Sequence, residues 1–96
     1  MDSRTPHLRE FAINADIVLT DLIRDAASAM PVEPLVIHDI IKLAGKTLQP
    51  RNLAEEQVIL DVFWDYFRGD RPWLCLGWDI DHTREPFFHV IRGRER

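Results

Sequence analysis

Cysteine and long apolar runs are scarce in this sequence. Its one cysteine, Cys75, cannot form an internal disulfide, so we expect the chain to fold in a reducing compartment. Because Cys75 stands between two leucines, we expect it to be a small packing residue with its thiol buried in the core. No apolar run approaches the roughly 18 residues of a membrane-spanning helix, and the first ten residues lack the apolar segment of a secretion signal. These absences predict a cytoplasmic protein that does not enter the membrane.

Glycine is also scarce, and its positions argue against one class of function. The four glycines are isolated from one another, and none of them opens a helix after a strand. A phosphate-binding loop needs clustered glycines, because its backbone amides must approach the phosphates closely. Nucleotide hydrolysis is therefore not expected, and the sequence predicts no cofactor.

Positive charge is the third scarcity. The chain has 96 residues and a net charge of −4, and this length favours a single domain over residues 1–96. The charge is −5 over residues 1–67 and +1 over residues 68–96. A protein that binds the nucleic-acid backbone needs a cationic face, so nucleic acid is not the favoured partner. A protein partner with a basic or mixed surface fits this distribution better.

The N-terminal half has the patterns of two helices. Apolar residues recur at steps of three and four from Leu8 to Ala26, which predicts an amphipathic helix over residues 6–30. Proline cannot continue a helix but fits its first turn. We therefore expect the first helix to end before Pro31 and a second helix, over residues 34–49, to begin at Pro34.

A third helix is predicted over residues 53–68. Asn52 stands three residues before Glu55, which is the spacing of a helix N-terminal cap. Eight of the ten residues from 58 to 67 are apolar, so this helix must be covered on nearly all sides. We expect it to be the centre of the fold, with Gly69 in a left-handed conformation just beyond its C-terminus.

The apolar period changes from helical to alternating after residue 72. Apolar residues at 74, 76, 78 and 80 predict a strand, and a polar turn and a returning strand follow. A β-hairpin over residues 73–92 is marginal by itself in water, so it must pack on the helices or pair with a strand from elsewhere. The predicted fold class is α+β: three helices and a C-terminal antiparallel β-hairpin, in the element order of a winged helix.

That element order raises nucleic-acid binding as an alternative function. In a winged helix the third helix enters the major groove and usually presents cationic side chains. Here we expect the third helix to present acidic residues to solvent: Glu55, Glu56, Asp61 and Asp65. The third helix is therefore not expected to contact nucleic acid. The alternative function is a nucleic-acid-associated regulator that uses the arginine-rich hairpin as its wing.

Carboxylates and imidazoles gather around the predicted hairpin turn. They are Asp79, Asp81, His82, Glu85 and His89. Such groups can hold a divalent ion or form an acid–base pair. Aspartate is also common in ordinary turns, because its side chain hydrogen-bonds local backbone. We favour the solvated turn, and the sequence predicts no metal site and no catalytic residue.

Aromatic residues are concentrated in the last third of the chain. Eight of the nine follow residue 62: Phe63, Trp64, Tyr66, Phe67, Trp73, Trp78, Phe87 and Phe88. We expect Phe63, Phe67 and Trp78 to be core. One helix and one hairpin offer little cover for the other aromatic side chains, which indicates that part of the set forms an exposed binding patch. The alternative is that the whole set belongs to the core.

An exposed patch of this composition is typical of a protein-binding surface. Its expected anchors are Trp64, Trp73 and Phe87, with Arg71 and Arg84 on the rim. The sequence thus predicts a small non-enzymatic protein-binding domain of the inhibitor, immunity, antitoxin or adaptor type. Its partner is expected to be another protein or a second copy of this chain.

Overall fold

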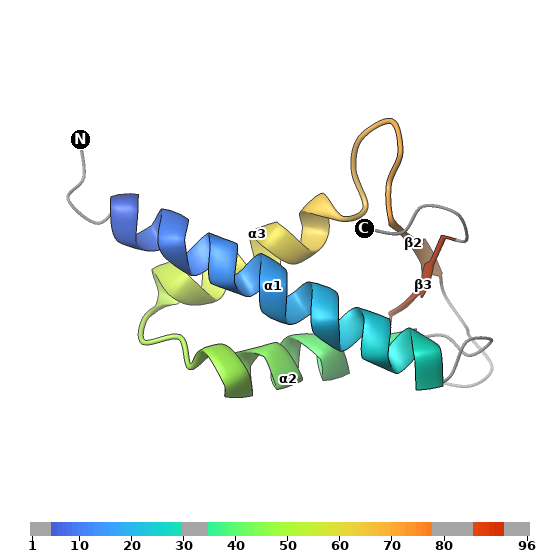
Figure 1. Cartoon of the computed structure of the whole chain (residues 1–96), viewed down its shortest axis with the longest axis horizontal. Helices are drawn as coiled ribbons and strands as arrows, with labels where there is room; N and C mark the ends of the chain where they lie inside the picture. The colour runs from blue at the N-terminus through green and yellow to red at the C-terminus, as the bar shows by residue number, and fades with distance from the viewer. Residues whose placement is uncertain (1–4, 30–34, 78–85, 92–96) are drawn as a thin grey trace.

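A computed structural model describes residues 5–29, 35–77 and 86–91 of the chain. Its helices are α1 (Thr5–Ala29), α2 (Ile37–Leu48) and α3 (Leu53–Asp65), and its strands are β1 (Leu35–Val36), β2 (Leu74–Gly77) and β3 (Phe87–Val90). Three helices are thus joined to a small antiparallel sheet (Figure 1). The predicted α+β class is confirmed.

The long helix α1 organises the other two helices. It lies across both, and it contacts α2 and α3 more extensively than they contact each other (Figure 1). Ala15, Leu19 and Ile23 are fully buried along it, at the four-residue spacing that places side chains on one helix face. Ile40 and Ala44 of α2 are buried as well. The core therefore lies beneath α1.

The predicted limits of α3 are right at its start and late at its end. Asn52 is the N-cap, and its Oδ1 accepts a hydrogen bond from the backbone N–H of Glu55 at 2.9 Å. The helix ends at Asp65, three residues before the predicted end. Arg68 Nη1 lies 3.5 Å from Asp65 Oδ1 in the turn that follows. Gly69 has a φ of 92°, which confirms the expected left-handed residue.

The sheet has a third strand that the sequence pattern did not predict. Its strand order is β1-β3-β2, and both pairings are antiparallel. The second helix was expected to begin at Pro34, but Leu35 and Val36 pair with Phe88 and Phe87 before α2 begins at Ile37. The hairpin thus finds the additional strand that its marginal stability required. Leu35 is buried, so the extra strand also closes the core.

The two faces of the sheet differ in exposure, because side chains alternate along each strand. Leu74 and Phe88 lie on the inner face and are buried. Cys75 lies on the outer face opposite His89 and is exposed, so the prediction of a buried thiol is wrong. On the same face a Cβ at Gly77 would meet the Phe87 ring at 2.5 Å. Glycine is therefore required there for the ring to lie across β2.

Candidate functional site

Phe63 is the centre of the aromatic cluster. Its ring makes T-shaped contacts with Trp64, Tyr66, Phe67 and Phe88, at centroid separations of 5.7, 6.4, 5.3 and 5.4 Å. Phe63 itself is fully buried, and Phe67 is half-buried against the core. Edge-to-face packing of this kind adds to the free energy gained from burial. The expected core roles of Phe63 and Phe67 are confirmed, whereas Trp78 lies outside the described residues.

Trp73 belongs to the core rather than to an exposed patch. Its side chain is 3% exposed. The backbone N–H groups of Trp73 and Leu74 both donate to the carbonyl oxygen of Tyr66, at 2.9 and 3.0 Å. This turn folds the chain back on α3 and sets the Trp73 ring against Tyr66, with centroids 5.3 Å apart. The expectation that Trp73 is an exposed anchor is therefore wrong, because a backbone turn supplies cover that the sequence pattern does not reveal.

The remaining expected patch residues do not gather around one another. Trp64 and Phe87 are half-buried, Arg71 is exposed, and Arg84 lies outside the described residues. Trp64 contacts the rings of Phe63 and Phe67, whereas Phe87 lies on the outer sheet face with its ring 5.5 Å from that of His89. Within the described residues no ring contact joins Trp64, Trp73 and Phe87. The three side chains therefore lie in three separate parts of the molecule.

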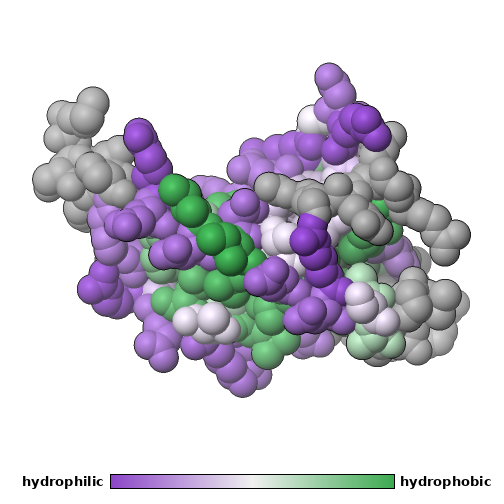
Figure 2. Space-filling model, viewed as in Figure 1, coloured by the Kyte–Doolittle hydropathy of each residue, from purple (hydrophilic) through white to green (hydrophobic). Residues whose placement is uncertain are grey.

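An apolar surface that the sequence analysis missed lies on α1. Ile13 and Ile17 are each 57% exposed, one helical turn apart. Figure 2 shows an apolar stripe where α1 crosses the front of the molecule, with hydrophilic residues on both sides. The available signal was their position, since both lie about half a turn away from the buried set Ala15, Leu19 and Ile23. We name Ile13 and Ile17 the α1 outer face.

Glu55 is a buried carboxylate with two partners that are more exposed, His7 and Arg51, where α1 meets α3. It was expected to face solvent, but it is 1% exposed. The backbone N–H of Arg51 donates to Oε1 at 2.8 Å, and Nε2 of His7 donates to Oε2 at 2.8 Å. Arg51 Nη2 lies 3.6 Å from the same Oε2. The cluster fixes the first turn of α1 against the N-terminus of α3.

The pKa of Glu55 is held below its usual value of 4.5 by these contacts. The backbone hydrogen bond from Arg51 contributes most, and the hydrogen bond from His7 follows. Burial acts in the opposite direction, and the Arg51 charge adds to the lowering. Glu55 is therefore an ionised structural carboxylate at neutral pH. No group of three His, Cys, Asp or Glu side chains that could hold a metal ion occurs in the described part of the chain.

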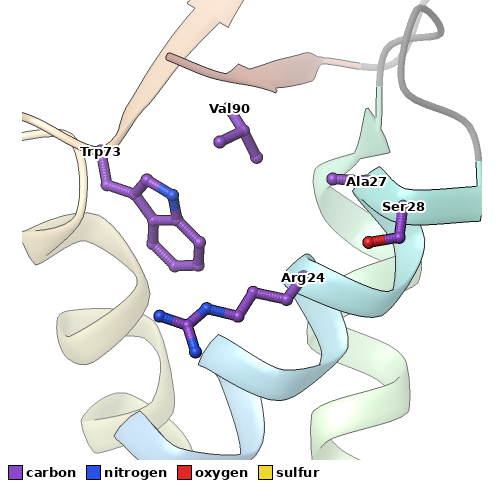
Figure 3. Close-up of a pocket in the computed structure, with 5 residues that line it drawn as sticks. All are labelled: Arg24, Ala27, Ser28, Trp73 and Val90. Carbon is purple, nitrogen blue, oxygen red and sulfur yellow. The ribbon is translucent and has the colours of Figure 1, made fainter. Parts of the chain in front are cut away.

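A cavity of about 300 Å³ lies between the C-terminal half of α1 and the sheet (Figure 3). Arg24, Ala27 and Ser28 line it from α1, and Trp73 and Val90 line it from the other side. The indole nitrogen of Trp73 is on the ring edge that faces the space between Val90, Ala27 and Ser28 (Figure 3). This cavity brings a buried tryptophan next to polar side chains of α1.

Comparisons with known proteins do not identify relatives. No protein-family model, curated protein or solved structure matches the chain. Among the described residues no helix is long and apolar enough to cross a membrane.

Proposed function

We propose that this chain is a non-enzymatic protein-binding domain that associates with a second copy of itself through the α1 outer face. The observation that carries the proposal is the exposure of two adjacent isoleucines, 57% each, on a helix whose other face forms the core. Scattered exposed apolar residues are normal on a protein surface. Two in register on one helix form a continuous stripe instead, and that stripe is covered when another helix packs on it.

The charges beside the stripe favour a second copy as the partner. Glu10 and Arg24 are exposed on α1 and lie seven residues before and seven residues after Ile17. When two α1 helices pack antiparallel about a two-fold axis at Ile17, Glu10 of each copy faces Arg24 of the other. A surface that meets its own copy in this way closes after two subunits. Opposite charges at both ends then fix the register of the pair.

The nucleic-acid alternative has less support than protein binding. The exposed residues of α3 include Glu56, Asp61 and Asp65, which would repel a phosphate backbone. The α1 outer face is apolar at its centre, and the exposed charges beside it are of both signs: Glu10, Asp21 and Arg24. Such a surface resembles a small protein interface, with an apolar centre and a polar rim.

Analytical ultracentrifugation tests the proposal on the full chain. The contact is small, so we expect a weak dimer with a Kd of about 10–100 μM, and sedimentation should be measured from ~5 to ~500 μM. The wild-type sedimentation coefficient should rise with concentration. Ile17→Arg should remain monomeric at every concentration, because a charge replaces the central contact. Leu53→Arg is the matched control, because Leu53 is an equally apolar residue that is 81% exposed and belongs to α3, not to α1.

Charge reversal tests the register of the pair. Glu10→Arg should weaken the dimer by placing like charges opposite each other, and the double variant Glu10→Arg/Arg24→Glu should restore it. A wild-type protein that stays monomeric up to ~500 μM contradicts self-association, since a Kd near 100 μM would make most of it dimeric. Equal loss of association in Ile17→Arg and Leu53→Arg would contradict the assignment of the surface.

A further inference from the structure

The cavity between α1 and the sheet contains a hydrogen-bond donor that has no acceptor. Trp73 Nε1 exposes less than 1 Å² and has no hydrogen-bond partner within the described part of the chain. An indole nitrogen can only donate, and buried tryptophans usually place this group against an acceptor. Nε1 is on the ring edge toward the cavity (Figure 3), and because it exposes less than 1 Å², an acceptor in the cavity reaches it only when the side chains around it shift.

The other polar side chains that line the cavity from the described residues can donate as well. Arg24 extends from α1 toward the Trp73 ring, and the hydroxyl of Ser28 borders the same space (Figure 3). A guanidinium donates and cannot accept, whereas a hydroxyl can do both. Among the described residues no carboxylate lines the cavity. A bound group must therefore supply acceptors, and negative charge on it would be favoured by Arg24.

The rest of the lining sets the size and character of the ligand. Ala27, Val90 and the ring of Trp73 are apolar. The volume of about 300 Å³ is roughly twice that of an engineered cavity that holds benzene, and it is at the lower end of small-molecule sites. A ligand of about ten non-hydrogen atoms with an apolar body matches this space.

We propose that this cavity binds a small monocarboxylate with an apolar body. Its carboxylate accepts from Trp73 Nε1 and from the Ser28 hydroxyl and pairs with Arg24, while its body lies against Val90 and Ala27. Arg24 and Ser28 are exposed side chains, so the ligand enters on their side by displacing Arg24. A buried donor without an acceptor costs free energy, because it has lost its hydrogen bond to water. The bound carboxylate removes this cost by accepting from Trp73 Nε1.

The probe for this proposal is benzoate, titrated at constant ionic strength into ¹⁵N-labelled full-length protein. A ligand of this size should bind with a Kd of about 1 mM. The indole N–H resonance of Trp73, assigned by its loss in Trp73→Phe, should move downfield as the hydrogen bond forms. Benzamide keeps the ring and removes the charge, so it should bind at least ~10-fold more weakly.

Variants locate the bound carboxylate. Trp73→Phe keeps an aromatic ring and removes the donor, so it should weaken benzoate binding by roughly 10-fold or more. Trp64→Phe is the matched control, because Trp64 does not line the cavity, and it should leave the Kd unchanged. Arg24 also belongs to the proposed dimer contact, so the titration is repeated in Ile17→Arg. Binding there should be at least as tight as in the wild type, because Arg24 of the monomer is not paired with Glu10 of a second copy, and this result separates the cavity proposal from self-association.

Two results would overturn the cavity proposal. One is a Trp73 indole resonance that does not move while benzoate is raised to ~50 mM, well above the expected Kd. The other is benzoate binding that is equally strong in Trp73→Phe and in the wild type, because the ligand would then lie elsewhere. The first result needs no substitution, so the test remains decisive even if Trp73→Phe fails to fold.

Discussion

Between α3 and β3, Phe63, Tyr66, Trp73 and Phe88 lie inside the molecule, whereas on α1 two isoleucines lie outside it. Tyr66 and Trp73 are 2% and 3% exposed, and Ile13 and Ile17 are each 57% exposed. The difference comes from coverage. The turn after α3 and the third strand close over the rings, but within the described residues no element covers the outer side of α1 (Figure 1). Residue type alone therefore does not decide which surface is available for binding.

The comparison also shows how polar groups accompany the buried rings. The Tyr66 hydroxyl donates to Asp16 Oδ1 at 2.6 Å, which gives the buried phenol an acceptor on α1. Trp73 Nε1 has no such partner among residues 5–29, 35–77 and 86–91. Since the two rings are in contact, the unpaired donor is a local exception and points to the adjoining cavity.

The largest expected effect is on the buried rings. Phe63→Ala and Trp73→Ala should each lower the free energy of unfolding by about 3–5 kcal/mol, because both leave cavities in the core. Trp64→Ala should cost less, about 1–2 kcal/mol, since Trp64 is only half-buried. Ile17→Ala should change it by under about 0.5 kcal/mol. Urea unfolding measures all four at a concentration where the wild type is monomeric, and equal losses for Trp73→Ala and Ile17→Ala would refute the contrast.

A smaller effect is expected where a buried ring carries a hydroxyl. Tyr66→Phe should lower the free energy of unfolding by about 1.5–3 kcal/mol, because a hydrogen bond to a charged acceptor is lost. A double-mutant cycle with Asp16→Asn isolates the pair. The sum of the two single-variant losses in the free energy of unfolding should exceed the loss in the double variant. Strict additivity would show that the Tyr66 hydroxyl is stabilised independently of Asp16.

The smallest effect is a change of stability with pH at the Glu55 cluster. The pKa of Glu55 is lowered in the folded chain, so its stabilisation is fully present above the unfolded value of 4.5 and is lost as pH falls through the folded pKa. As the pH is lowered below 4.5, the melting temperature of the wild type should therefore decrease. The melting temperature of Glu55→Gln should decrease less steeply over the same range. Glu56→Gln is the control, because Glu56 is exposed on the same turn. Identical slopes for the wild type and Glu55→Gln would contradict this account.

Local sequence signals predicted the helices but not the turns and pairings that cover them. The Asn52 cap, the left-handed Gly69 and the α+β class are all local or periodic features, and the structure confirms them. The strand at Leu35 and Val36 is two residues long and depends on a partner about fifty positions away. No periodicity reveals such a strand.

The candidate sites depend on the same non-local contacts. Burial of Trp73 follows from two amides that share the Tyr66 carbonyl, and burial of Glu55 follows from His7, 48 residues away. Aromatic density therefore suggested a patch where the fold forms a core. Ile13 and Ile17 lie about half a turn from the buried face of α1, so the helical period places them off the core, but only the positions of α2 and α3 show which side of α1 is covered.

Symmetric cross-linking at position 17 tests the central claim most directly. Ile17→Cys in a Cys75→Ser background carries a single thiol, because the natural cysteine is removed. If two α1 helices pack about a two-fold axis at this position, mild oxidation should give a disulfide-linked dimer rapidly at concentrations where the wild type self-associates. Leu53→Cys in the same background should remain largely monomeric. Equal cross-linking of the two variants, or no dimer from Ile17→Cys at those concentrations, would contradict the proposed role of the α1 outer face.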